Sequence, residues 1–301
     1  MPQTKPTPPR PISLKVEPKT KISESALRDA LTDLVRDDLD LSFTIDAESG
    51  ETIIHGVSEL HLDATVAKIF ARGVGVIVGA PRVAYRESLA RPADVDYTHK
   101  KQSGGTRQFA RVRIKLEPND TGKGNEFKTT FISGTVPKEY IPDVEKGVKS
   151  VWENGVLIGF PLFDMKVTLY GGAFHDIDSS ASAFEIATRA AMKEGCEKGG
   201  IMILEPIMDV EVVTPHDCVG SIIGDLNASR AHIRTIEDRD TDAKVIRAKV
   251  PLALLFGYVS RLGSLSGGRA SHSMAFSHYE AVPRNDANDP GTFPPAIGMR
   301  A

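Results

Sequence analysis

The order in which strand-like and helix-like hydrophobic patterns alternate is the feature that most limits how this sequence can fold. In residues 41–46 the apolar Leu41, Phe43 and Ile45 fall on one face of an extended segment, whereas residues 21–35 carry apolar side chains at helical spacing. These patterns predict strands at residues 12–16, 41–46, 52–56 and 74–78, and helices at residues 21–35 and 59–71. This strand–helix–strand–strand–helix–strand order is that of a ferredoxin-like α+β domain.

The same order of elements returns near the C-terminus. Strands are predicted at residues 207–214, 231–237, 244–250 and 269–277, and helices directly after Thr214-Pro215 and over residues 252–262. Threonine followed by proline indicates a helix start, because the hydroxyl can cap the first turn and proline fits its first position. The repeat is architectural, without obvious similarity at the level of residues.

A longer α/β region separates the two repeats. In residues 108–116 apolar and basic side chains alternate, which predicts a strand with one buried and one exposed face. Gly155 follows a helical pattern and suits a helix end. The other predicted elements here are a strand over residues 163–170 and helices over residues 138–154 and 181–193.

We therefore expect an α+β chain with three domains, in which two ferredoxin-like domains flank an α/β domain. They are called here the first domain (residues 12–82), the middle domain (residues 83–205) and the last domain (residues 206–283). Residues 1–11, rich in proline, are predicted to be a linker or a disordered N-terminus, and residues 284–301 a flexible tail.

Composition narrows the class of protein. Hydrophobic residues make up 41% and charged residues 26% of the 301 residues, which is ordinary for a globular chain. No apolar run approaches the roughly 18–20 residues that a membrane span requires, so we expect no membrane partner. Two cysteines give no disulfide framework and fit a reduced, cytoplasmic setting. With a net charge of −3, nucleic-acid contacts would have to come from local basic patches.

Two segments carry residues suited to chemistry or binding. His175, Asp176 and Asp178 lie in a predicted strand-to-helix loop, where they could bind a divalent cation, act as a general base with its orienting carboxylate, or contact a partner. The plainest alternative is that Asp178 or Ser179 only caps the next helix. Adjacent loop residues do not easily converge on one ion, so no metal site is assigned.

The second segment is basic. Residues 100–107 (Lys-Lys-Gln-Ser-Gly-Gly-Thr-Arg) precede Arg111, Arg113 and Lys115 at period two, with Phe109 among them. Such a surface suits a polyanion, because lysine and arginine displace counterions and an aromatic ring can stack on a base. A solvated, solubilising strand face is at least as compatible with the spacing alone.

Nearly the whole chain, from about Ile12 to Pro283, resembles elongation factor G. The stretches that carry the resemblance are Gly56-Val57-Ser58-Glu59-Leu60-His61-Leu62-Asp63, Gln102-Ser103-Gly104-Gly105, Val136-Pro137-Lys138-Glu139-Tyr140-Ile141-Pro142, His175-Asp176-Ile177-Asp178-Ser179-Ser180, Leu204-Glu205-Pro206-Ile207-Met208 and Ile223-Gly224-Asp225-Leu226-Asn227. One such stretch would be a weak signal, but so many in the right order are specific.

The resemblance implies that the three domains are like the third, fourth and fifth domains of that family. The fourth is an elongated α/β unit with a βαβ crossover of left-handed sense, whose two end loops enter the decoding region of the small ribosomal subunit. The fifth approaches large-subunit RNA. The residues that the resemblance implies in ribosome or RNA contact are Lys100, Lys101, Gln102, Ser103, Gly104, Gly105, Arg107, His175, Asp176, Asp178, Gly224, Asp225, Asn227 and Arg230.

The resemblance also implies a function. The chain would be the C-terminal, ribosome-binding part of a translation factor that promotes tRNA–mRNA translocation, acting as a monomer in the cytoplasm. Its partners would be ribosomal RNA, ribosomal proteins and the tRNA–mRNA complex. No cofactor is expected in this chain, because GTP and Mg²⁺ belong to the family's N-terminal domain.

Alternatives remain open at this stage. The sequence departs from the family at Arg107, at Ala228-Ser229-Arg230 and around Arg261, which could mark a ribosome-recycling or ribosome-protection paralogue. From a different class, a metal-dependent hydrolase centred on His175, Asp176 and Asp178 stays possible on residue types alone.

A first prediction concerns nucleotide. The printed sequence contains no G-x-x-x-x-G-K-[ST] loop, so it lacks the backbone cradle and lysine that hold nucleotide phosphates in that motif. We expect the isolated chain neither to bind nor to hydrolyse GTP, with or without ribosomes. Equilibrium dialysis with labelled GTP checks this, and micromolar affinity would contradict it.

Overall fold

The computed structural model describes residues 10–20, 23–45, 51–79, 82–103, 106–130, 136–239 and 242–283. Within it, Tyr85–Leu204 belongs to one compact unit, and the first and last domains are grouped in the other. The predicted linker at residues 1–11, apart from its last two residues, and the predicted tail at residues 284–301 lie outside the described residues.

The first domain has the predicted ferredoxin-like order. Its elements are β1 (Ile12–Pro18), α1 (Ser23–Asp37), β2 (Ser42–Ile45), β3 (Thr52–Gly56), α2 (Glu59–Ala71), β4 (Val76–Val78) and the short β5 (Arg82–Val83). The strands lie in the order β2-β3-β1-β4 with antiparallel neighbours, and both helices contact the sheet. Ser58 caps α2, because its hydroxyl accepts the backbone N–H of His61 at 3.2 Å.

The last domain repeats this topology, also as predicted. Its elements are β11 (Ile201–Pro215), the 3₁₀ turn η2 (His216–Cys218), α5 (Val219–Ala228), β12 (His232–Asp238), β13 (Ala243–Pro251), the 3₁₀ turn η3 (Leu252–Leu254), α6 (Tyr258–Ser266) and β14 (Ser271–Ala281). The strand order is β12-β13-β11-β14, so corresponding strands take the same positions as in the order β2-β3-β1-β4 of the first domain.

Two local predictions in the last domain were wrong. Thr214 does not cap a helix: it is buried in β11, which continues through Pro215, and its hydroxyl donates to the Pro215 carbonyl at 3.4 Å. The helix predicted over residues 252–262 is broken, because Gly257 has a φ of 68° and separates η3 from α6. That left-handed conformation is one that glycine adopts without steric cost.

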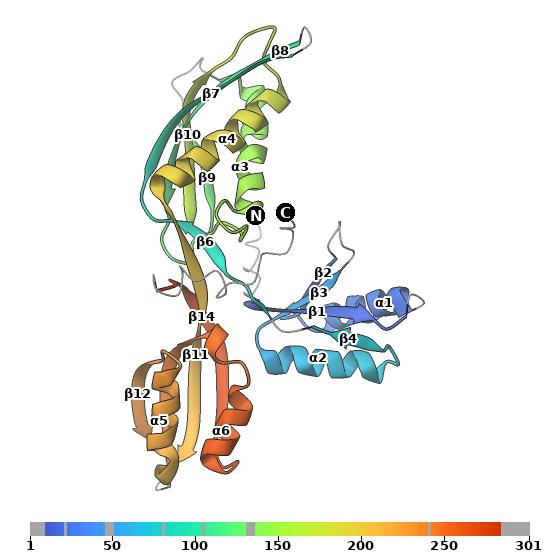
Figure 1. The fold of residues 1–301 in the computed structure, drawn as a ribbon, viewed down its shortest axis with the longest axis vertical. Coiled ribbons are helices and arrows are strands. Elements are labelled where there is room, and N and C mark those ends of the chain that lie inside the picture. The colour runs from blue at the N-terminus through green and yellow to red at the C-terminus, as the bar shows by residue number, and fades with distance from the viewer. Residues whose placement is uncertain are drawn as a thin grey trace. The chain divides into compact units, whose positions relative to one another are not determined.

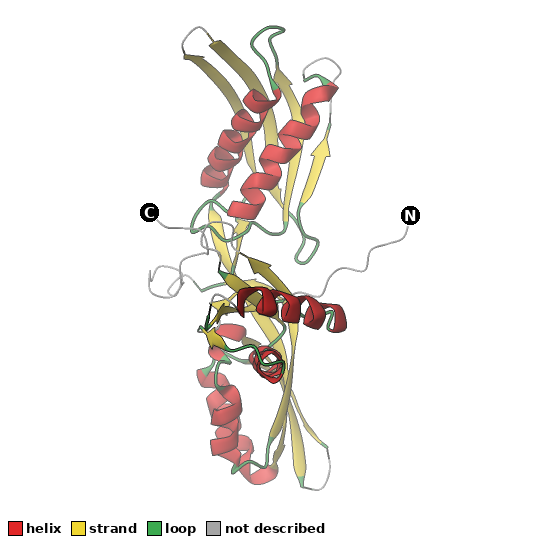
Figure 2. Ribbon diagram, turned by 90° about the vertical axis from the view of Figure 1, so that its right-hand side faces the viewer, coloured by secondary structure: helices red, strands yellow, loops and turns green. Residues whose placement is uncertain are grey.

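The middle domain is a sheet covered on one face by two helices. Its elements are β6 (Arg86–Leu89), β7 (Ala93–Ser103), β8 (Thr106–Pro118), β9 (Glu126–Thr129), the 3₁₀ turn η1 (Lys138–Tyr140), α3 (Ile141–Asn154), β10 (Met165–Ala173) and α4 (Ala181–Gly199). The sheet order is β7-β8-β10-β9, and β9 runs parallel to β10 with α3 in the connection between them, which is a βαβ crossover. Figures 1 and 2 show α3 and α4 side by side against this sheet.

Alternation along β8 and β10 builds the core of this domain. The inward side chains of β8 (Ala110, Val112, Ile114 and Leu116) are fully buried. They meet Met165, Val167 and Leu169 of β10 and apolar residues of both helices, among them Val148 and Phe184. The predicted period of two therefore separates a dry face from a charged face, which is the outward surface that bears Arg111 and Arg113.

A buried carboxylate organises the turn that follows α3. Glu87 is fully buried in β6, and its two carboxylate oxygens accept backbone N–H groups from five consecutive residues, Val156, Leu157, Ile158, Gly159 and Phe160, at 2.6–3.2 Å. Gly155, the predicted helix end, opens this turn with a φ of 66°. A Cβ there would lie 2.2 Å from the Phe160 carbonyl oxygen, so only glycine fits.

We predict that Glu87→Ala destabilises the middle domain by at least about 3 kcal/mol, because five N–H groups of this turn, partly or fully buried, lose their acceptor together. Glu87→Gln should cost less, since its amide oxygen can still accept. Trp152, the one tryptophan of the chain, lies near the end of α3 just before the turn, so urea unfolding followed by its fluorescence reports on this region. Glu153→Ala, at an exposed position one residue further on, is the control and should stay within about 0.5 kcal/mol.

Candidate functional site

One end of the middle domain carries the hairpin between β7 and β8. Pairing runs from Ala93↔Leu116 to Ser103↔Thr106, and Gly104 and Gly105 between them lie outside the described residues. Residues 100–107 are called the hairpin end here. Lys100, Lys101, Gln102 and Arg107 are exposed. No carboxylate among the described residues forms an ion pair with any of these three cations.

The loop from β10 to α4, residues 174–180, is called the His175 loop. It folds back on itself through a backbone bond from Ser179 N–H to the His175 carbonyl at 3.0 Å and a bond from His175 N–H to Ser179 Oγ at 2.9 Å. His175, Asp176 and Ile177 are exposed at its outermost turn. The predicted cap was wrong in detail: Ser180, rather than Asp178 or Ser179, caps α4 by accepting the Ala183 N–H at 3.2 Å.

The ring of His175 has one nitrogen turned inward. The Ile177 N–H donates to Nδ1 at 3.3 Å, and Asp178 Oδ2 lies 3.6 Å from the same nitrogen. In the neutral ring, accepting the Ile177 N–H requires the lone pair on Nδ1, so the proton resides on Nε2. The half-exposed imidazole can then offer Nε2–H as a donor to an oxygen of a partner.

Phe109 of β8 joins the two loops. Its N–H donates to the Asp178 carbonyl at 2.9 Å, and its carbonyl accepts the Ser179 hydroxyl at 2.7 Å. On the other side, Phe109 is paired with Lys100 of β7. The structure therefore brings together two sets of residues that the sequence places about seventy positions apart, at the end of the sheet seen in Figure 1.

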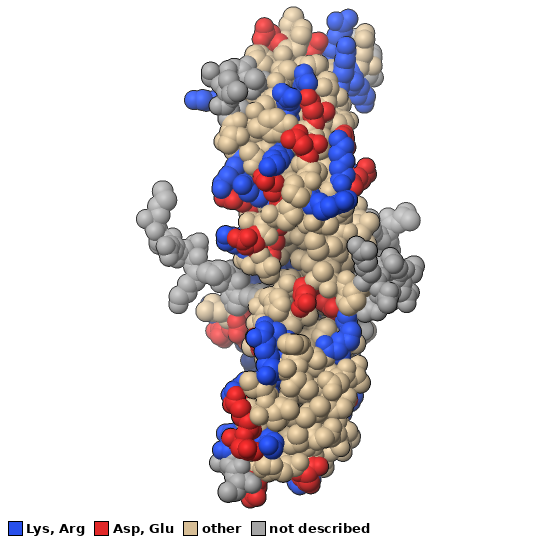
Figure 3. All heavy atoms as spheres, turned by 90° about the vertical axis from the view of Figure 1, so that its left-hand side faces the viewer, with Lys and Arg blue, Asp and Glu red and all other residues tan. Residues whose placement is uncertain are grey.

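The arginines of the strand face below the hairpin end are already paired with a carboxylate. Arg111 makes two bonds to the Asp96 carboxylate, at 2.7 and 2.6 Å, and Arg113 approaches the same group at 3.2 Å. The hydrogen bond from Arg111 holds the pKa of Asp96 below its ordinary value, despite partial burial. Figure 3 shows the result as positive and negative side chains intermingled on this face.

Other pairs follow the same pattern. Lys115 contacts Glu117 at 2.7 Å, and the Tyr170 hydroxyl donates to Asp94 at 2.5 Å. Burial first, and then this bond, raises the pKa of Tyr170. Sequence reasoning counted the cations of β8 and missed their partners, Asp96 of β7 and Glu117 of β8 itself. The available signal for Asp96 was its alternation with Asp94 at a period of two in the neighbouring strand.

The predicted residues of the last domain divide into two kinds. Gly224 and Asn227 are exposed on α5. Asp225 is partly buried, with Oδ1 3.5 Å from Arg261 Nε. Arg230 makes two bonds, at 3.0 and 2.8 Å, to Glu205, whose carboxylate is nearly fully buried. The charge of Arg230 is therefore engaged within the chain, whereas Gly224 and Asn227 remain available to a partner.

Metal binding and thiol chemistry find little support in the described part of the chain. No group of three or more His, Cys, Asp or Glu side chains there could hold a metal ion, and His175 with Asp178 is only a pair. Burial, and then the nearby charge of Glu87, raises the pKa of the Cys196 thiol to about 12, so it stays protonated. None of the described helices has the length and apolar character needed to cross a membrane.

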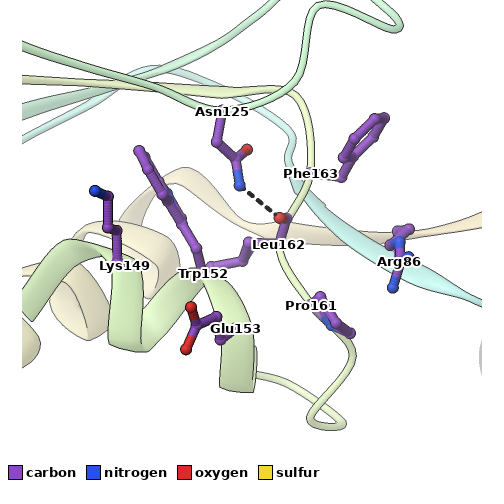
Figure 4. A pocket seen from close by; sticks show the side chains of 8 residues that line it. All are labelled: Arg86, Asn125, Lys149, Trp152, Glu153, Pro161, Leu162 and Phe163. Carbon is purple, nitrogen blue, oxygen red and sulfur yellow. Dashed lines mark hydrogen bonds between the residues drawn. The ribbon is translucent and has the colours of Figure 1, made fainter. Parts of the chain in front are cut away.

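A pocket of about 370 Å³ lies near the C-terminal end of α3. Figure 4 shows Trp152 and Asn125 on its wall, with the Asn125 amide donating to the Leu162 carbonyl at 2.8 Å. Lys149 stands at its edge, and it also contacts Glu145 at 2.7 Å. None of the predicted site residues lines this pocket, so it does not form part of the candidate site.

Comparison with known proteins covers all three domains. Family models match as "Elongation Factor G, domain III" over residues 7–80, "Elongation factor G, domain IV" over residues 81–200 and "Elongation factor G C-terminus" over residues 202–290. A solved structure from Thermus thermophilus aligns with a TM-score of 0.72 at 34% identity, covering 92% of this chain and 42% of that one.

Curated relatives indicate the same family as the domain models. Elongation factor G of Paracoccus denitrificans is 52% identical over 279 residues, which cover 92% of this chain and 39% of the relative. That of Rhodopseudomonas palustris is 53% identical over 276 residues, with 91% and 40% covered. The chain thus spans about two fifths of the length of the relatives that it matches. With three successive domain models matched in order at this identity, the chain belongs to the elongation factor G family.

Proposed function

We propose that this chain is the ribosome-binding part of a translation factor that promotes tRNA–mRNA translocation. Family membership supports translation as the process, and the matched domains are those other than the GTPase domain. The geometry supports the end of the middle domain as the part that meets RNA. The partners would be ribosomal RNA, ribosomal proteins and the tRNA–mRNA complex, met in the cytoplasm by a monomer that itself holds neither nucleotide nor metal.

The observation that carries the proposal is a contrast within one sheet. Arg111 and Arg113 are paired with Asp96, whereas Lys100, Lys101 and Arg107 at the hairpin end have no ion pair among the described residues. Unpaired cations are the ones that can neutralise phosphates and release counterions. The basic charge available to a polyanion is therefore concentrated beside the His175 loop.

The His175 loop adds directional contacts to this charge. Its outermost residues are exposed, and the imidazole can donate from Nε2 because its Nδ1 accepts the Ile177 N–H. Such groups suit phosphate or ribose oxygens, which position a protein on RNA without reading its sequence. Gly224 and Asn227 of α5 are the residues that we propose for contact with large-subunit RNA.

His175→Ala tests the proposal. We expect stability to change by less than about 0.5 kcal/mol, because the side chain is exposed at a loop. In a factor that joins this chain to the GTPase half of a relative, single-turnover translocation should slow by roughly tenfold, the loss of one bond to a charged group. Ribosome-stimulated GTP hydrolysis should remain near the parental rate.

His232→Ala is the matched control for that experiment, since it removes an exposed imidazole from a strand of the last domain. It should translocate at the parental rate. If His175→Ala also does so, the His175 loop is only structural and the proposal for this loop is refuted.

Asp96→Asn tests the charge argument. Because Arg111 lowers the pKa of Asp96, the pair is intact at neutral pH and is lost only in acid. Removing the charge there should release Arg111 and Arg113, tighten binding of the chain to a structured RNA at pH 7 and steepen the salt dependence of log K by about one. The stability loss should be under about 1 kcal/mol, since the pair is partly exposed.

RNA affinity measured by filter binding at several salt concentrations checks this. Asp120→Asn, which removes an exposed partner of Lys123 in a loop, is the control and should leave the slope unchanged. Equal slopes for Asp96→Asn and the parent would show that the strand face takes no part even when its cations are released.

A further inference from the structure

Ser179 lies where the sheet of the middle domain gives way to the His175 loop. Strand β10 pairs with β8 only as far as Ala173↔Arg111. Beyond that point Asp178 and Ser179 occupy the edge of β8 instead, because Phe109 donates its N–H to the Asp178 carbonyl and accepts the Ser179 hydroxyl. The His175 loop therefore bonds to β8 at a point beyond the last pairing of β10 with β8.

The Ser179 hydroxyl makes two bonds in opposite senses. It donates to the Phe109 carbonyl at 2.7 Å and accepts the His175 N–H at 2.9 Å. A hydroxyl is the smallest side-chain group that can donate and accept together. This one atom therefore connects the backbone of β8 with the backbone of His175, across about seventy residues of sequence.

Phe109 carries the connection on to the basic hairpin. It is paired with Lys100 of β7, and the next pairs outward are Lys101↔Gln108 and Gln102↔Arg107. The position of His175 relative to these cations is thus set by the hydrogen bonds of Phe109 and Ser179. The helix cap does not do this, because Ser180 caps α4 and bonds within its own first turn.

We propose that Ser179 is a positioning residue that fixes His175 beside Lys100, Lys101 and Arg107, so that imidazole and cations meet one stretch of RNA backbone together. This inference rests on the function proposed above for the His175 loop. Ser179 acts through His175, since its hydroxyl proton is donated to the Phe109 carbonyl and one of its lone pairs accepts the His175 N–H.

Amide hydrogen exchange of the ¹⁵N-labelled chain tests the connection without ribosomes. In Ser179→Ala the His175 amide loses its acceptor, so its exchange should speed up by about tenfold or more. Ser179→Thr keeps the hydroxyl and should restore slow exchange. Ser180→Ala removes the neighbouring helix cap, and should destabilise the first turn of α4 while leaving the His175 amide slow. Parental exchange of His175 in Ser179→Ala would overturn the inference.

Translocation by the joined factor tests the consequence. Misplacement of His175 in Ser179→Ala should slow single-turnover translocation by roughly tenfold at saturating factor. GTP hydrolysis and the melting temperature should be unchanged, and Ser179→Thr should rescue the rate. Because Ser179 acts through His175, the double variant with His175→Ala should be no slower than His175→Ala alone.

The outcomes separate the two claims. If His175→Ala is slow and Ser179→Ala is parental, the positioning role fails and the proposed function stands. If the two substitutions slow the reaction additively, Ser179 acts independently of His175 and the positioning role also fails. If His175→Ala itself is parental, the proposed function of the loop fails first.

Discussion

A single carboxylate with no exposure to solvent stabilises the turn that follows α3 in the middle domain. Glu87 accepts five successive backbone N–H groups, which without it would have no acceptor in a turn that belongs to no helix or strand. The arrangement also fixes its neighbours: Gly155 must be glycine, and the Cys196 thiol is kept protonated partly by the Glu87 charge. The helix α3 therefore ends at a defined place, and β10, which follows the turn, enters the sheet in a defined register.

Much of this fold could be predicted, because the signals for it are local. The alternation along residues 108–116 specified the buried and exposed faces of β8, and Gly155 marked the end of α3. Both ferredoxin-like orders were confirmed. The errors came where a local sequence pattern was compatible with two different structures. Thr214-Pro215 fits a helix start, but Thr214 is paired with Lys244 in the sheet, and that pairing continues through Pro215.

The candidate site was harder to predict, for a physical reason. The polar residues that shape it act on backbone atoms or on distant side chains, and neither leaves a period in the sequence. Asp96 neutralises Arg111 only because the register of β7 with β8 sets them diagonally across the ladder. Ser179 stands in a loop that reads as a helix start, and its bond to Phe109 appears only once the chain has folded back.

The pairing of Arg111 and Arg113 with Asp96 has a consequence for turnover. A surface that grips RNA along the whole strand would release it slowly, since each added phosphate contact lowers the rate of dissociation. Under the function proposed above, slow release would limit the rate of repeated cycles. Because Arg111 and Arg113 are already bonded to Asp96, the cations left without an ion pair in the described part of this sheet are those of the hairpin end, so the proposed contact would involve few groups and its release would be fast.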